Sequence, residues 1–215
     1  MGFAHHIRNS LTAVRGFIQI MREKTYGEPV TGFAEFSSIA LKELDRVNDV
    51  IGNLLHLADL SNTKREAVNV DNLLENIYAF IKGKAALSAI LVIKEFSPEL
   101  PSPCVDVVRI IHALFNILDN AMKSMPDGGR LLMRSYAIPA EGMVCIEITD
   151  TGVGIPPENI KNIFNPFFST REDGVGFGLA LANKVINDHG GVIRVTSEEG
   201  KGSTFSVYLP IKRLV

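Results

Sequence analysis

The sequence has few cysteines, little net charge and no long apolar run. Its two cysteines, Cys104 and Cys145, form no CxxC pair and have no histidine nearby at metal-ligand spacing. Isolated cysteines of this kind are typical of buried thiols in a reducing compartment. The formal net charge of −2 at pH 7 gives no reason to expect nucleic acid or an anionic membrane as the main partner. No apolar run approaches the ~20 residues of a membrane span, and nothing resembles a signal peptide.

The chain begins abruptly, with Met1-Gly2 directly before the dense motif FAHHIRNSLT at residues 3–12. This beginning predicts a fragment of a longer protein. We expect the region to be a cytoplasmic one, and a parent protein anchored in the cell membrane is compatible with it.

Apolar residues recur every three or four positions through the first sixty residues, with one break at YGEPV, residues 26–30. The two stripes comprise Ala4, Ile7, Leu11, Val14, Ile18 and Met21, then Phe33, Phe36, Ala40, Leu44, Val47, Ile51, Leu54 and Ala58. They predict two long helices in an antiparallel hairpin over residues 1–62. A lone hairpin leaves apolar residues such as Phe17 and Leu55 uncovered, so we predict a homodimer with a four-helix bundle. Packing of the hairpin against a second domain is the alternative.

Residues 61–66, SNTKRE, are polar and predict a linker, which we place at 63–69. Residues 70–215 alternate between helical and strand patterns. The expected helices run from a cap at Asp71 to about Leu87, from Asp106 to near Met125, and from near Phe177 to about His189. The expected strands cover residues 90–96, 130–138, 143–149, 192–197 and 203–209, with a long loop at 151–176. Helices grouped on one face of a mixed sheet make a two-layer α/β sandwich.

The segment NILDNAMK, residues 116–123, places Asn116 and Asn120 one helical turn apart on the same face. Amide oxygens suit one or two positions on Mg²⁺, whose other positions go to phosphate and water. Lys123 adds a cation for the phosphates. A helix with two solvated asparagines is the simpler alternative for this segment alone.

The segment DTGVG, residues 150–154, follows an apolar strand. A carboxylate at a strand end, here Asp150, can accept a hydrogen bond from the amino group of adenine. Gly152 and Gly154 would let the backbone approach a flat base closely. An ordinary β-turn is the alternative.

The segment GVGFGLAL, residues 174–181, has three alternating glycines that lead into a helix. Free N–H groups and the helix dipole at Gly174, Gly176 and Gly178 would favour an anion. A loop precedes these glycines, so they are not a Rossmann fingerprint, and the sequence contains no P-loop. The last segment, GKGSTF at residues 200–205, predicts a turn that enters the final strand.

In this order, these segments and NPFFST at residues 165–170 resemble the ATP-binding domain of sensor histidine kinases. The opening FAHHIRNSLTAVRGFIQIM resembles the dimerisation and phosphoacceptor hairpin of the same family. Its LTAVRGFIQ stretch is most similar to the sporulation kinases of spore-forming bacilli. The resemblance covers the whole chain. It implies a dimeric four-helix bundle followed by an ATP-binding sandwich of the histidine kinase, gyrase and Hsp90 type.

The resemblance implies that His5 is the phosphoacceptor. A neutral imidazole nitrogen is a suitable nucleophile near neutral pH. His6 departs from the family, which normally has Glu or Asp there as a general base. Asn9 matches the family position associated with removal of the phosphoryl group, and Ser10 replaces the usual proline.

For the nucleotide, the resemblance implies ATP with Mg²⁺ held by Asn120 and Asn116. Asp150 would bind adenine with Gly152 and Gly154 beside it. The remaining expected nucleotide contacts are Lys123, Gly174, Gly176, Gly178, Leu179 and Thr204.

The implied function is ATP-dependent phosphorylation of His5, followed by transfer to an aspartate of a response regulator, in sporulation signalling. The implied partners are a second copy of the chain, a response-regulator receiver protein and small inhibitor proteins that dock on the hairpin. A gyrase- or Hsp90-type ATP hydrolase is the first alternative, but such proteins have a glutamate where Asn116 stands. A binding module that transfers no phosphate is the second alternative.

Overall fold

The computed structural model describes residues 14–16, 39–40, 64–171 and 176–211, and the chain divides into two units. One unit comprises residues 1–61 and 167–177, the other residues 62–166 and 178–215. The predicted hairpin therefore lies almost wholly outside the described residues. Val14 and Ala40, one from each apolar stripe, are helical and buried.

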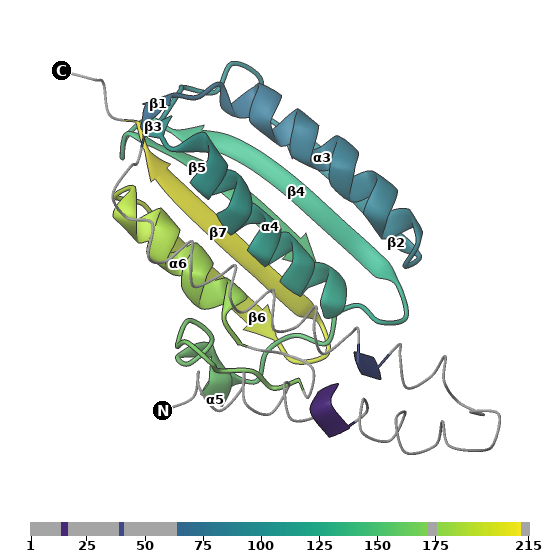
Figure 1. Ribbon diagram of the computed structural model, residues 1–215. Helices are drawn as coiled ribbons and strands as arrows, with labels where there is room; N and C mark the ends of the chain where they lie inside the picture. Colours follow the sequence, from purple (N-terminus) through teal and green to yellow (C-terminus); the bar gives the residue numbers. More distant parts are fainter. Residues whose placement is uncertain (1–13, 17–38, 41–63, 172–175, 212–215) are drawn as a thin grey trace, which may run out of the picture. The chain divides into compact units, whose positions relative to one another are not determined.

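The second unit contains a five-stranded sheet with the order β2-β4-β5-β7-β6 (Figure 1). Its strands are β2 (Ile90–Phe96), β4 (Gly129–Ile138), β5 (Met143–Asp150), β6 (Val192–Glu198) and β7 (Gly202–Pro210). Strand β2 runs parallel to β4, and the other neighbours are antiparallel. The mixed sheet and the five predicted strands are confirmed.

Three helices cover one face of this sheet: α3 (Val70–Ala86), α4 (Val107–Lys123) and α6 (Gly178–Asp188) (Figure 1). Apolar residues recur in α4 at the helical period, and its Ile110, Leu114 and Ile117 are fully buried. They share the core with buried sheet residues such as Phe205 and Ile148. The two-layer α/β sandwich is thus the observed fold.

The start of α3 differs from the prediction. Asn69, not Asp71, is the N-cap, and its Oδ1 accepts a hydrogen bond from the N–H of Asn72 at 2.9 Å. Val70 is 1% exposed and already helical, so Asp71 lies inside the first turn, where its charge still complements the helix dipole. At α4 the prediction is confirmed, because Asp106 is the N-cap.

Short elements were missed where the sequence reads as loop or linker. Within the predicted linker, Glu66–Ala67 form β1, which pairs antiparallel with β3 (Cys104–Val105). The loop after β5 contains a short helix, α5 (Pro157–Ile160). Both cysteines are free; Cys145 is buried and Cys104 is half-buried.

Candidate nucleotide-binding site

The amide side chain of Asn116 lies where α4 meets the beginning of α6. Its Nδ2 donates to the carbonyl of His112 at 3.0 Å, which orients the amide. A Cβ atom added at Gly178 would lie 2.9 Å from Asn116 Oδ1, so glycine permits this close approach. The first turn of α6, with Gly178 and Leu179, has backbone N–H groups without intrahelical acceptors. The structure therefore brings a fixed amide oxygen to a helix N-terminus that favours anions.

Asn120 lies one turn further along α4 and is half-buried like Asn116. Two amide oxygens on one helix face are suitable donors for Mg²⁺ and leave most ligand positions to phosphate and water. Among the described residues, no cluster of three or more His, Cys, Asp or Glu side chains could hold a metal ion. The donor set thus fits a metal that arrives with a polyphosphate.

Lys123 is paired with a carboxylate in this structure. Its Nζ lies 2.6 Å from Asp119 Oδ2, and Lys84 Nζ lies 3.0 Å from Asp119 Oδ1. Burial opposes ionisation of Asp119, but the two ammonium groups outweigh it and hold the pKa of this carboxyl below its usual value. The Lys123 side chain is 63% exposed, and an ion pair this exposed is worth only about 0–1 kcal/mol. Lys123 can leave Asp119 for a phosphate at little cost.

Asp150 is the last residue of β5 and is only 2% exposed. Its Oδ1 accepts hydrogen bonds from the N–H of Gly152 at 2.9 Å and from the hydroxyl of Ser124 at 3.0 Å. A Cβ atom at Gly152 would collide with Ser124 Oγ, so this glycine is needed by the turn itself. Ser124 carries no motif signal, and the sequence prediction missed it.

The backbone also requires glycine at position 154. Its φ of +70° is in the left-handed region, and a Cβ atom there would collide with the carbonyl oxygen of Glu198. The neighbouring Val153 carbonyl accepts from Gly200 N–H at 2.8 Å. Close packing against the β6–β7 turn therefore accounts for glycine at position 154, whether or not a base lies beside it.

Thr204, which the sequence predicts as a nucleotide contact, lies on the other face of the sheet from Asp150. The strand register places Ser203 opposite Asp150 and Thr204 opposite Thr149. Successive side chains of a strand point to opposite faces, so Ser203 shares the helix-covered face with Asp150. Thr204 Oγ1 instead lies 2.9 Å from Thr149 Oγ1. The strand register therefore determines which of the two adjacent hydroxyls shares a face with Asp150.

The remaining predicted site residues are His5, His6, Asn9, Gly174 and Gly176. His5, His6, Asn9 and Gly174 lie outside the described residues. Gly176 belongs to the unit that contains residues 167–177. Within that unit it has a φ of +68°, and its carbonyl accepts from Phe167 N–H at 2.7 Å.

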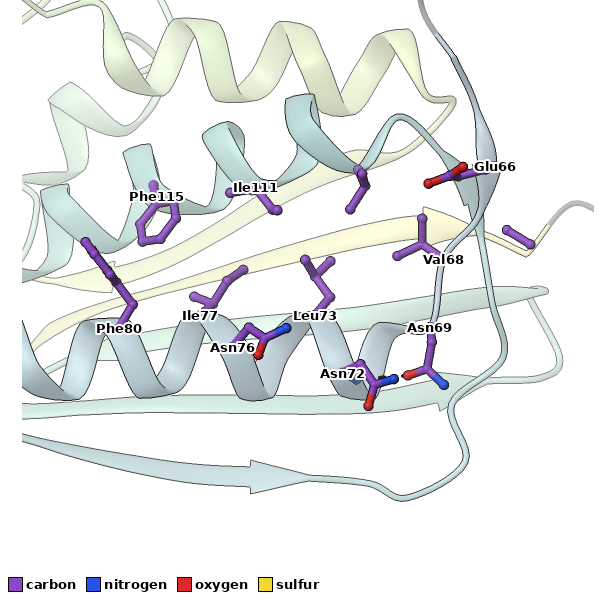
Figure 2. A pocket seen from close by; sticks show the side chains of 12 residues that line it. Glu66, Val68, Asn69, Asn72, Leu73, Asn76, Ile77, Phe80, Ile111 and Phe115 are labelled. Carbon is purple, nitrogen blue, oxygen red and sulfur yellow. Dashed lines mark hydrogen bonds between the residues drawn. The ribbon is translucent and has the colours of Figure 1, made fainter.

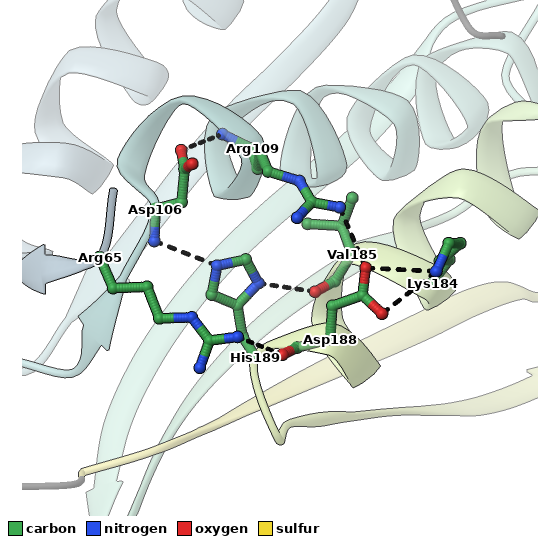
Figure 3. A network of polar contacts seen from close by, with 7 residues as sticks. All are labelled: Arg65, Asp106, Arg109, Lys184, Val185, Asp188 and His189. Carbon is green, nitrogen blue, oxygen red and sulfur yellow. Dashed lines mark hydrogen bonds and ion pairs between the residues drawn. The ribbon is translucent and has the colours of Figure 1, made fainter. Parts of the chain in front are cut away.

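A polar cluster holds the far end of α6 against the start of α4 (Figure 3). The ring of His189 is 4% exposed; its Nδ1 lies 2.7 Å from the carbonyl of Val185, and its Nε2 accepts from Asp106 N–H at 3.1 Å. Since Nε2 accepts, Nδ1 carries the proton of a neutral imidazole. Burial, assisted by Arg65 and Arg109, lowers the pKa of His189 below its ordinary value.

The neighbouring Asp188 strengthens the same junction. Its carboxylate lies 3.0 Å from Arg109 Nη2 and 3.2 Å from Lys184 Nζ, and its backbone carbonyl accepts from Arg65 Nη2 at 2.6 Å. These contacts fix the orientation of α6, the helix whose other end begins at Gly178.

An apolar cavity of about 670 Å³ lies elsewhere in this unit, between α3 and α4 (Figure 2). Its apolar lining includes Val68, Leu73, Ile77, Phe80, Ile111 and Phe115. None of the predicted nucleotide-binding residues lines it. In the part of the chain that the structure describes, no helix is long and apolar enough to cross a membrane.

The geometry defines an α/β sandwich with a buried carboxylate, an amide pair and a helix N-terminus at one site. Residues 105–213 match the family described as histidine kinase-, DNA gyrase B- and HSP90-like ATPase. Residues 2–63 match the His Kinase A (phospho-acceptor) domain. The chain therefore belongs to the sensor histidine kinases.

Named relatives agree with this family. The chain is 36% identical over 210 residues to the signal transduction histidine-protein kinase AtoS of Escherichia coli, covering 98% of this chain and 34% of AtoS. It is 32% identical over 212 residues to sporulation kinase E of Bacillus subtilis, covering 99% of this chain and 28% of that kinase. The chain thus spans about a third of the length of these relatives.

A solved structure is also similar. Histidine kinase ThkA in complex with the response regulator protein TrrA superposes with a TM-score of 0.80 and 27% identity. The superposition covers 97% of this chain and 60% of that one. It includes both family regions, since the chain is covered almost completely.

Proposed function

We propose that this chain is a histidine autokinase of a two-component system or phosphorelay. ATP binds with its base at Asp150 and its phosphates at the N-terminus of α6, and the γ-phosphoryl group passes to His5. Mg²⁺, held by Asn120 with Asn116, neutralises phosphate charge. The phosphoryl group then passes to an aspartate of a response regulator.

The observation that carries the proposal is the layout of functional groups along α4. Asn116 lies next to Gly178 at one point, and Ser124, hydrogen-bonded to Asp150, lies eight residues further on. At 1.5 Å per residue this separation is about 12 Å. Asn120 and Lys123 lie between the two points. One helix can therefore serve the phosphates at one end and the base at the other.

Asn116 also favours transfer over hydrolysis. An amide cannot abstract a proton from water as a carboxylate can. Bound ATP therefore survives until a nucleophile such as the neutral imidazole of His5 attacks it. A binding site that positions ATP without activating water fits an autokinase better than an ATP hydrolase.

The finer assignments belong to the same proposal. A homodimeric bundle over residues 1–62, a linker at 63–69 and an ATP-binding domain at 70–215 are its organisation. A response-regulator partner is supported by ThkA, which was solved with TrrA. A role in sporulation, as for the kinase called KinB, is supported by the LTAVRGFIQ stretch and by the 32% sequence identity to sporulation kinase E. The sequence identity to AtoS is higher, at 36%. Docking of inhibitor proteins and a membrane anchor in the parent rest on the resemblance alone.

The fate of the γ-phosphate tests the proposal. The chain is incubated with Mg²⁺ and γ-labelled ATP, with an Asp150→Asn variant as control for nucleotide binding. We expect acid-labile, alkali-stable label on the wild-type protein and little on the variant, because phosphohistidine has that stability. Free phosphate without labelled protein would indicate a hydrolase, and neither product would indicate a binding module.

A further inference from the structure

Ser124 connects the end of α4 to the buried carboxylate. It is the C-cap of α4, and its Oγ lies 3.0 Å from Asp150 Oδ1 and 2.7 Å from the carbonyl oxygen of Ala121. Its own carbonyl accepts from Val153 N–H at 3.1 Å. The serine thus contacts the DTGVG turn through both its side chain and its backbone.

The hydroxyl has one proton and two acceptors within reach. A bond to a carboxylate is stronger than a bond to a neutral carbonyl. The Ala121 carbonyl also accepts from Ser124 N–H at 3.2 Å, so it keeps a donor when the hydroxyl turns away. Asp150 is nearly fully buried, and a buried carboxylate requires donors to stay ionised. The proton of Ser124 therefore goes to Asp150.

We propose that Ser124 is a positioning residue that sets the preference of this site for an adenine base. This inference rests on the proposed function, in which Asp150 receives the amino group of adenine. Together with Gly152 N–H, the hydroxyl places two donors on Oδ1 and fixes the plane of the carboxylate. An ionised carboxylate offers only acceptors, so it pairs with an exocyclic amino group and repels a carbonyl oxygen in the same place.

Removal of the hydroxyl should weaken this discrimination. In Ser124→Ala the carboxylate loses the hydroxyl donor on Oδ1, so its plane is less constrained. A carboxylate that can turn discriminates less sharply between an amino group and a carbonyl oxygen. The affinity for ATP should fall while the affinity for inosine triphosphate, which has a carbonyl in place of the amino group, should fall less or rise. We expect the preference for ATP to drop about tenfold, the effect of one charge-assisted hydrogen bond.

The experiment measures dissociation constants of the whole chain for Mg²⁺-ATP and Mg²⁺-inosine triphosphate by calorimetry. Ser88→Ala is the matched control, since Ser88 follows the C-cap of α3 and is exposed. We expect Ser88→Ala to keep the wild-type ratio of the two constants.

Two outcomes contradict the inference. Equal weakening of both nucleotides by Ser124→Ala would mean a structural role, and two unchanged dissociation constants would mean that the hydroxyl does not act on the base. In either case the wild type still prefers ATP, so the proposed function stands. A wild type that binds neither nucleotide, or does not prefer ATP, overturns the proposed function as well.

Discussion

Gly152→Ala should disrupt the turn that holds Asp150. The added Cβ would collide with Ser124 Oγ and lie 2.5 Å from the carbonyl oxygen of Ser124, whereas carbon atoms normally pack at about 3.5–4.0 Å. The turn must therefore move by about 1 Å, which breaks the Val153–Ser124 backbone bond and the bond from residue 152 to Asp150. A neutral bond is worth about 1 kcal/mol and one to a charged group about 1.5–3 kcal/mol. The expected loss is about 2.5–4 kcal/mol.

Hydrogen exchange of the β5 and β7 amides, measured by mass spectrometry on the whole chain, reports this loss in the unit that contains Gly152. Exchange should accelerate roughly a hundredfold, because each 1.4 kcal/mol is about a factor of ten. Gly83→Ala is the control, since nothing lies within 4 Å of its added Cβ in α3. It should stabilise the unit by about 0.5–1 kcal/mol. Exchange of Gly152→Ala within threefold of wild type would refute the close contact with Ser124.

Three further changes test other parts of the account. In the folded chain the pKa of His189 lies below its ordinary value of 6.5. As the pH falls, the unfolded chain therefore binds the proton first, and the folded state loses stability. The contribution of neutral His189 to stability is complete above about pH 6.5 and is lost as the pH falls toward the folded pKa. His189→Gln should remove this slope from urea midpoints measured between pH 8 and pH 5, whereas His112→Gln should keep it. His6→Glu should raise the initial rate of His5 labelling, because a carboxylate accepts the Nδ1 proton of His5 better than a neutral imidazole does. An unchanged rate would show that residue 6 does not accept this proton. Phe205→Ala should lower the free energy of unfolding by about 3–5 kcal/mol in thermal unfolding, because Phe205 is 0% exposed. The control Val153→Ala, at a residue that is 60% exposed, should lower it by less than about 0.5 kcal/mol. Equal losses in the two variants would contradict the placement of Phe205 in the core.

Local patterns predicted the strands and α4 well. The short apolar run of β5 and the helical period of α4 each identify a buried element without any distant partner. The turn at Gly152 and Gly154 also follows from a local signal, because a short Asp-Gly cluster after a strand is typical of a turn. The sheet and most of the site's backbone follow from such patterns.

Contacts between distant segments could not be predicted. The strand β1 exists only because residues 104–105 pair with it, and the bond from Ser124 to Asp150 joins the ends of a helix and a strand. The register of β7 places Ser203, and not Thr204, on the same face of the sheet as Asp150. At α3, Asn69 and Asp71 are both good caps, and burial of Val70 decides between them.

Labelling of wild type, His5→Gln and His6→Ala with γ-labelled ATP and Mg²⁺ tests the central claim most directly. The account predicts acid-labile label on the wild type and on His6→Ala, and none on His5→Gln. Label on His5→Gln at the wild-type level would contradict it.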